Sequence, residues 1–256
     1  MDPKEKVKQQ FGKNAQKYVE SESHAKASDL DELVQWLQPH TGMVALDIAT
    51  GGGHVAKKLA PNVKCVFATD LTKEMLEKTR IFLQEYSNVS YVLADAEKLP
   101  FLDDSFDIVT CRIAPHHFPN PTAFISEVSR VLVPKGKFIL IDNIAPEDEG
   151  LANFMNTFEK LRDKSHVRCL SQNDWLYLFK KHNLKVVREN KRKKTHDYAT
   201  WIKVTAESRE QQEQVTEFIL KGKDEQLDYF SVKTLNGKIT SVTIDECMIL
   251  GEKMET

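Results

Sequence analysis

The feature that most constrains the fold is an alternation of apolar strands and amphipathic helices between residues 41 and 143. Five apolar segments have the length of strands: 43–49, 64–70, 89–95, 106–113 and 137–143. Three segments between them have the spacing of helices: 54–60, 72–86 and 120–132. The strands are continuous apolar runs, which is typical of parallel strands covered on both faces. The alternation therefore predicts a doubly wound α/β fold.

The flanking segments predict a lid, a cap and an antiparallel edge. Residues 3–38 are helical by pattern and would form an N-terminal lid. After Asn143 amphipathic helices and an inserted helical segment follow, and Asn236-Gly237 is a strong hairpin signal. We expect one domain, 1–256, with a mostly parallel seven-stranded sheet and an antiparallel C-terminal strand. Its parts are a helical lid (1–40), a ligand-binding core (41–143), and an inserted helical cap with the C-terminal strands (144–256).

Composition narrows the class of protein. The 256 residues carry a net charge of -2, which argues against a dedicated nucleic-acid binder. A short basic run at 188–194 could contact RNA or anionic lipid, but aromatic residues do not interleave it. The chain has no long apolar stretch, and its N-terminus is charged from the second residue. Its four cysteines are scattered. We expect a cytoplasmic protein with no membrane span and no metal site, whose oligomeric state stays open, a homodimer included.

The first strand ends in a stretch that suits a ligand. Asp47 lies near the end of the strand, and Ala49 and Thr50 lead into the glycines 51–53. In a doubly wound sheet ligands bind outside the carboxyl ends of the strands. Glycine permits positive φ and lets a ligand approach the backbone closely. Alternatively, a glycine-rich loop alone is often only a tight turn.

The next two strands also end in acids. Asp70 ends the second strand, about twenty residues downstream, where a carboxylate can accept hydrogen bonds from both hydroxyls of a ribose. Asp95 ends the third strand, where it could accept from an adenine amine while the Ala96 amide donates to the ring. Alternatively, Asp70 is a helix N-terminal acid and Asp95 an ordinary turn residue.

Two cofactors fit a site for a ribose and an adenine: a dinucleotide and S-adenosylmethionine. In the dinucleotide pattern G-x-G-x-x-G the third glycine is absent if Gly51 begins the count, because position 56 is Ala, although a variant of the pattern allows alanine there. Asp47 would repel a pyrophosphate but would attract the cationic amino-acid end of S-adenosylmethionine. The loop therefore favours S-adenosylmethionine.

These segments resemble the class I S-adenosylmethionine-dependent methyltransferases, and more closely the type 11 group related to ubiquinone/menaquinone biosynthesis C-methyltransferases. "VALDIATGGGH" resembles the first motif, LD-x-G-x-G-x-G, with Ala49 in place of the first glycine. "ATDLTKEML" and "ADAEKLPF" resemble the next two motifs, and the likeness covers roughly residues 44–142. It implies the following cofactor contacts: Asp47, Ala49, Thr50, Gly51, Gly53, Asp70, Leu71, Asp95 and Ala96.

The fourth strand leads into two adjacent histidines. Methyl transfer from a sulfonium requires mainly positioning, with a base where the acceptor must lose a proton. His116 and His117 lie where such a base or an orienting group would be needed. Each could equally be a hydrogen-bonded structural residue. Arg112 could approach the cofactor through its backbone, or its side chain could pair with a nearby acid.

Polar residues also occur in the lid and in the cap. Tyr18 and His24 would contact the cofactor from the lid, or would simply pack at the surface. In the cap, Arg162, His166 and Arg168 could hold an acidic or phenolic substrate, although a solvated helix end is the simpler interpretation.

The leading hypothesis is S-adenosylmethionine-dependent methyl transfer to a small-molecule acceptor, such as a quinone precursor or a phenolic metabolite. The alternatives are an NAD-dependent oxidoreductase and a non-catalytic protein that binds an adenosyl ligand.

Overall fold

The predicted strands form one eight-stranded sheet in the computed structural model, which describes residues 2–19 and 29–255, Lys17 by its backbone alone. Five parallel strands come first: β1 (Val44–Ile48), β2 (Cys65–Asp70), β3 (Val89–Leu93), β4 (Phe106–Arg112) and β5 (Leu132–Ile144). β8 (Lys238–Lys253) is antiparallel to both β5 and β6 (Leu184–Asp197). The order is β3-β2-β1-β4-β5-β8-β6, and the short β7 (Lys233–Leu235) pairs with β8. The mostly parallel sheet with an antiparallel C-terminal strand is confirmed, and the short β7 makes an eighth strand where seven were expected.

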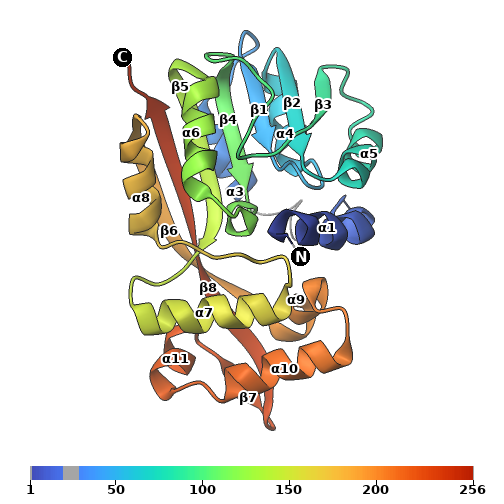
Figure 1. Cartoon of the computed structure of the whole chain (residues 1–256), viewed down its shortest axis with the longest axis vertical. Coiled ribbons are helices and arrows are strands. Elements are labelled where there is room, and N and C mark those ends of the chain that lie inside the picture. Colours follow the sequence, from blue (N-terminus) through green and yellow to red (C-terminus); the bar gives the residue numbers. More distant parts are fainter. Residues whose placement is uncertain (1, 20–28, 256) are drawn as a thin grey trace.

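Helices cover both faces of the parallel part of the sheet (Figure 1). Leu46 and Ile48 of β1 pack in the same core as α6 (Pro121–Val131) and α8 (Gln172–Lys181). Ala45, the neighbour of Leu46 in sequence, packs with α3 (Asp29–Leu37) and α4 (His54–Leu59). Successive strand residues thus serve opposite cores, as continuous apolar strands require. The short η1 (Ala60–Asn62) follows α4, and α5 (Lys73–Phe82) packs on β2 and β3.

The inserted cap forms a separate layer below the parallel strands (Figure 1). It consists of α7 (Glu149–Arg162), α9 (Tyr198–Thr205), α10 (Arg209–Leu220) and α11 (Asp224–Tyr229). These helices share an aromatic core with Val242 and Ile244 of β8. Because β6 and β8 run through both layers, the cap is continuous with the sheet.

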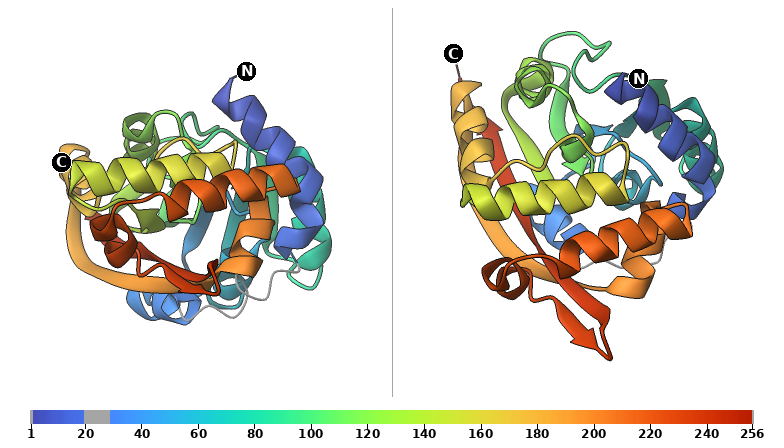
Figure 2. Two further views of the ribbon diagram at one scale, coloured as in Figure 1. Left: turned by 90° about the horizontal axis from the view of Figure 1, so that it is seen from below. Right: turned by 60° about the horizontal axis from the view of Figure 1, so that its bottom comes forward.

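The N-terminal helix α1 (Pro3–Val19) lies where the lid is predicted, beside α5 and near α9 and α10 (Figures 1 and 2). Gln10 Nε2 donates to the carbonyl oxygen of Thr205 across 3.4 Å. The lid therefore contacts both the parallel core and the cap.

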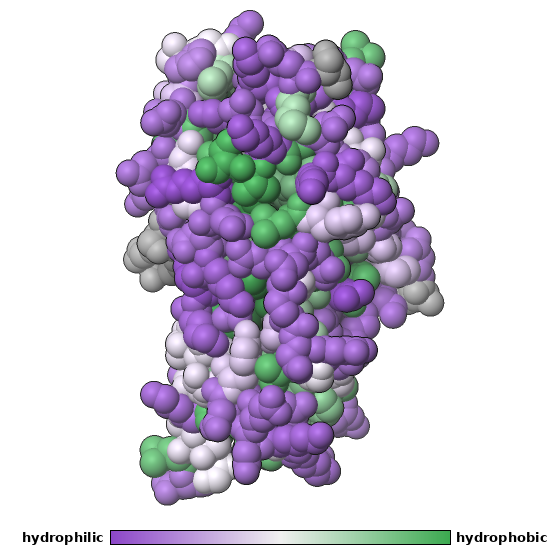
Figure 3. Space-filling model, turned by 90° about the vertical axis from the view of Figure 1, so that its left-hand side faces the viewer, coloured by the Kyte–Doolittle hydropathy of each residue, from purple (hydrophilic) through white to green (hydrophobic). Residues whose placement is uncertain are grey.

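The basic run lies inside β6 and pairs with two acids of β8, Asp245 and Glu246, whose side chains are 1% exposed. Arg192 and Lys194 contact Glu246, and Lys191 Nζ lies 3.1 Å from Asp245 Oδ2. These ion pairs give Lys191, Arg192 and Lys194 a structural role inside the sheet. The β6 side of the molecule is mainly hydrophilic, with an apolar area in its upper half (Figure 3). In the part of the chain that the structure describes, no helix is long and apolar enough to cross a bilayer.

Candidate functional site

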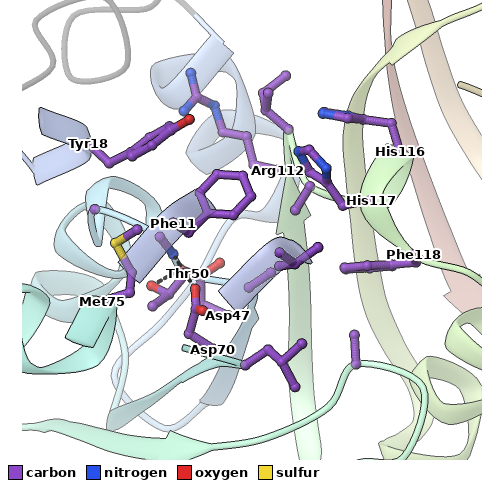
Figure 4. Close-up of a pocket in the computed structure, with 18 of the residues that line it drawn as sticks. Phe11, Tyr18, Asp47, Thr50, Asp70, Met75, Arg112, His116, His117 and Phe118 are labelled. Carbon is purple, nitrogen blue, oxygen red and sulfur yellow. Dashed lines mark hydrogen bonds between the residues drawn. The ribbon is translucent and has the colours of Figure 1, made fainter. Parts of the chain in front are cut away.

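A cleft opens at the carboxyl ends of the parallel strands, where β1 lies between β2 and β4 and the strand order reverses. The lid helix α1 and the end of α7 close its other sides. The predicted site residues that line it are Tyr18, Asp47, Ala49, Thr50, Gly51, Asp70, Leu71, Asp95, Ala96, Arg112, His116 and His117. Gly53 is not among the lining residues, and His24 lies outside the described residues. In Figure 4, Asp47, Thr50 and Asp70 lie on one side of the cleft and His116, His117 and Phe118 on the other.

The residues of the glycine loop have different structural roles. Ala49 (φ 51°), Gly51 (φ 52°) and Gly53 (φ 80°) adopt the left-handed conformation, so the alanine bears strain that a glycine would avoid. A Cβ at Gly53 would lie 2.6 Å from Thr79 Cγ2, which places this glycine against α5 instead of the cleft. A Cβ at Gly52 would lie 2.5 Å from the Tyr18 carbonyl oxygen. Gly52, which sequence reasoning did not select, thus admits the end of the lid.

We expect Gly52→Ala to displace the end of α1. The new methyl group would collide with main-chain atoms, which cannot rotate away, so the free energy of unfolding should fall by about 1–3 kcal/mol. Denaturant titration and hydrogen exchange of the α1 amides would measure the effect. Gly12→Ala, within α1 itself, is the matched control, because a Cβ at Gly12 would meet nothing closer than 3.5 Å. Equal exchange protection of α1 in both variants would contradict the prediction.

Asp47 and Asp70 are buried carboxylates at the ends of β1 and β2. Asp47 accepts hydrogen bonds from Thr50 Oγ1 (2.6 Å) and Thr110 Oγ1 (2.8 Å). Asp70 accepts from the main-chain nitrogens of Gly51 (3.1 Å) and Thr72 (2.9 Å). Burial raises the pKa of each carboxyl to about 6, although these hydrogen bonds oppose the shift. Both groups would therefore gain from a cation or from hydroxyl donors in the cleft.

Asp70 also lies at the start of α5. The structure is therefore compatible with both interpretations of this residue, a ligand-binding acid and a helix N-terminal acid. Thr72 occupies the N-cap position, but its side chain makes no capping bond there. Asp70 Oδ1 accepts from the Thr72 amide instead. The same carboxylate thus fixes a helix and faces the cleft.

Asp95 has a partner that the sequence did not indicate. Lys4 of the lid lies 2.6 Å from Asp95 Oδ2 and 2.6 Å from Glu97 Oε2. All three residues line the cleft. A ligand amine that bound Asp95 would share or displace the ammonium of Lys4.

The side chain of Arg112 is committed to an acid, as one of the two interpretations expected. Its Nε donates to Asp29 Oδ2 (2.5 Å) and its Nη2 to Asp29 Oδ1 (3.1 Å). The exposed fractions of the two side chains are 6% and 0%. This bidentate pair ties the start of α3 to the cleft end of β4, and leaves only the Arg112 backbone for a ligand.

His116 and His117 form a short 3₁₀ turn, η2 (Pro115–His117), after β4. Asp142, at the end of β5, accepts from the His116 main-chain nitrogen (2.9 Å) and from His116 Nδ1 (2.6 Å). Burial disfavours the imidazolium, but the charge and hydrogen bond of Asp142 outweigh it and raise the pKa of His116. His116 is thus both hydrogen-bonded and basic.

His117 has a different environment. Its Nδ1 lies 3.3 Å from Ser165 Oγ, which donates to Asp163 Oδ1 (2.5 Å). Since that hydroxyl hydrogen is used, Nδ1 of His117 donates to Ser165. Burial and the neighbouring His116 lower the pKa of His117 to about 3, so its ring is neutral.

Residues of the cap complete the cleft only in part. Arg162 lines it, but its guanidinium is held by Glu159 (2.7 Å) and lies over the ring of Trp201. His166 is buried, and its Nε2 lies 3.0 Å from Asn156 Oδ1. Arg168 is not among the lining residues.

On the lid, Tyr18 lies close to His54, the first residue of α4. His54 Nε2 donates to the Tyr18 carbonyl oxygen (3.0 Å). Phe11, also on α1, packs its ring against Tyr18 and against His117, with centroid separations of 5.1 and 5.0 Å. The lid therefore contacts both ends of the cleft, near the glycine loop and near the histidines.

Comparison with known proteins decides the family. A family model described as a methyltransferase domain matches residues 46–140. YcgJ, an uncharacterized methyltransferase of Bacillus subtilis (strain 168), is 36% identical over 95% of this chain and 97% of its own length. The chain belongs to the S-adenosylmethionine-dependent methyltransferases.

Further similarities agree with this methyltransferase assignment. A crystal structure of a Bacillus halodurans C-125 protein, provisionally assigned as a methyltransferase, superimposes with a TM-score of 0.87, at 37% identity over 90% of this chain and all of that one. The ubiquinone/menaquinone biosynthesis C-methyltransferase UbiE of Rickettsia peacockii is 35% identical over 44% of this chain and 48% of its own. The resemblance stated from the motifs is thus confirmed, and the NAD-dependent oxidoreductase is not supported.

Proposed function

We propose that this methyltransferase holds S-adenosylmethionine between the glycine loop and the lid, and methylates a small-molecule acceptor beside His116 and His117. The observation that carries the proposal is a cleft lined both by Asp47, Asp70 and Asp95, the acids that follow or end β1, β2 and β3, and by the histidine pair after β4. When bound, S-adenosylmethionine supplies a methyl group activated on a sulfonium, so the chain has to orient it and exclude water.

The donors and acceptors of the cleft fit this cofactor. Asp70 would accept from the ribose hydroxyls, with Leu71 packing on the adenine. Asp95 and the Ala96 amide would read the adenine edge, and Lys4 would have to share Asp95 with it. Asp47, Ala49, Thr50 and Gly51 would face the amino-acid end, where the carboxylate of Asp47 favours a cation.

The remaining predicted contacts would act in different ways. Arg112 would contribute through its backbone, because Asp29 holds its side chain. Tyr18 would cover the cofactor from the lid, and His24 stays a prediction from the sequence. Gly53 would act indirectly, by allowing the loop to pack on α5.

For the acceptor, we propose a flat apolar molecule such as a phenolic metabolite or a quinone precursor. Phe11, Phe118 and Val204 line the cleft, and Phe11 packs its ring against His117. The similarity to UbiE, a quinone-pathway C-methyltransferase by name, supports the same class. A cytoplasmic location and the absence of a nucleic-acid partner stay predictions from composition.

Calorimetry with S-adenosylmethionine and with S-adenosylhomocysteine tests the proposal. We expect both to bind with one site per chain, and no binding of either at millimolar concentration would reject it. A non-catalytic adenosyl-binding protein would bind both ligands but transfer no methyl group to any phenolic acceptor. Mass spectrometry of acceptor mixtures incubated with the cofactor would separate these two outcomes.

A further inference from the structure

Asp142 is a buried carboxylate that holds one histidine at two points. Its side chain is 1% exposed, and its two oxygens accept from the main chain and from the ring of His116. A carboxylate bound to Nδ1–H fixes both the tautomer and the orientation of an imidazole. The free lone pair of neutral His116 therefore lies on Nε2, and His116 lines the cleft.

We propose that Asp142 is a positioning residue that makes His116, and not His117, the base that removes a proton from a hydroxyl group of the methyl acceptor. The inference rests on the proposed function. In this step the acceptor O–H bond breaks, and the proton moves to Nε2 of His116. The acceptor oxygen forms the bond to the methyl carbon as the carbon–sulfur bond breaks, with its electron pair left on sulfur. The positive charge thus passes from sulfur to the imidazolium beside Asp142.

The groups around the two histidines favour this division of roles. Asp142 of β5, Glu159 of α7 and Asp163 after α7 all stabilise a positive charge on His116. The histidines that face it are His117 on the same turn, at 4.2 Å between ring centroids, and His166 at 5.6 Å. His117 has the hydroxyl of Ser165 between its ring and Asp163. A proton taken up by the pair therefore rests on His116, and neutral His117 would orient the acceptor.

A hydroxyl acceptor fits this arrangement better than an aliphatic amine. A neutral amine attacks with its own lone pair and needs no base during the transfer, whereas a hydroxyl becomes a good nucleophile only as its proton leaves. The apolar walls at Phe11 and Phe118 suit a hydroxyl carried on an aromatic or enolic ring.

Nitrogen-15 NMR of histidine-labelled protein tests the positioning role without an acceptor. We expect the neutral ring of His116 to be the Nδ1–H tautomer with a pKa above 6.5, and Asp142→Asn to lower that pKa and reverse the tautomer. The asparagine can still accept from the His116 amide, but its NH₂ group cannot accept from Nδ1. Asp107→Asn, at the amino end of β4 and outside the cleft lining, is the control. An Nε2–H tautomer in the parent protein, or no change in Asp142→Asn, would overturn the proposal.

Transfer to matched probes tests the base itself. With S-adenosylmethionine present at neutral pH, we expect the chain to methylate 4-methylphenol, whose hydroxyl is protonated there, and not 4-methylaniline, whose amine is neutral. Asp142→Asn and His116→Gln should lower kcat by about 10²-fold with cofactor affinity unchanged. His117→Gln should raise KM more than it lowers kcat. Methylation of the aniline alone, or full kcat in His116→Gln, would refute the inference. If neither probe reacts, the NMR result decides it. If the parent protein does not bind S-adenosylmethionine, the proposed function itself is refuted.

Discussion

Replacing Arg112 with methionine should lower the free energy of unfolding by about 3 kcal/mol. The change leaves the carboxylate of Asp29, which is fully buried, without its bidentate partner. Breaking a buried ion pair by removing one member typically costs about 3–5 kcal/mol, because the other charge stays desolvated. We expect the lower end of this range, since Arg192 lies 3.7 Å from Asp29 and compensates in part. Urea unfolding at neutral pH would measure the loss.

Two further variants show whether the buried charge causes this loss. Lys58→Met removes the exposed pair with Asp31, which has a similar N–O separation of 2.6 Å, and should cost less than about 1 kcal/mol. The double variant Arg112→Met/Asp29→Asn removes both charges and should recover most of the stability. If the double variant is as unstable as Arg112→Met, lost packing and not the unpaired carboxylate explains the effect.

The sequence predicted the parallel part of the fold because the signals there are local. Each strand from 43–49 to 137–143 is an apolar run bounded by a turn, and each helix between them has an apolar face. β6 continues to Asp197, well beyond its apolar residues Leu184, Val186 and Val187. From the sequence its basic residues are interpreted as a possible surface patch. Their partners, Asp245 and Glu246, come some fifty residues later, so the pairing gives no local signal. The six-residue helix α11 is too short to show a period.

The same limit applies to the candidate site. The acids at the ends of the first three strands were found by position, and they line one cleft. Asp142 obeys the same rule, at the end of the strand "KFILIDN", and could have been found by it. Lys4 gave no such signal, because only the packing of α1 brings it to Asp95. Ser165 and Asp163 likewise reach His117 only because the cap folds back over the sheet.

Asp70→Asn should weaken S-adenosylmethionine binding by about 10²-fold while leaving the fold nearly as stable. Hydrogen bonds to a charged acceptor contribute about 1.5–3 kcal/mol each, and the proposed ribose contact uses this carboxylate twice. The asparagine can still accept from the Thr72 amide, although it loses the bond from Gly51, at about 1 kcal/mol. That loss is offset because the neutral side chain avoids the desolvation of a buried charge. Calorimetry and urea unfolding would measure the two effects separately.

The pH dependence of stability gives an independent check on Asp70. Its pKa is about 6 in the folded chain and is raised from 3.8, so between these values the folded state binds more protons than the unfolded state. The free energy of unfolding from this group therefore falls as pH rises from about 4 to 6, and Asp70→Asn should flatten that slope. Asp107→Asn is the matched control, because Asp107 also accepts from a main-chain nitrogen, that of Val44, but at the amino end of β4, outside the cleft lining. It should leave cofactor affinity within about twofold, whereas an equally small change in Asp70→Asn would remove the ribose contact from the proposed site.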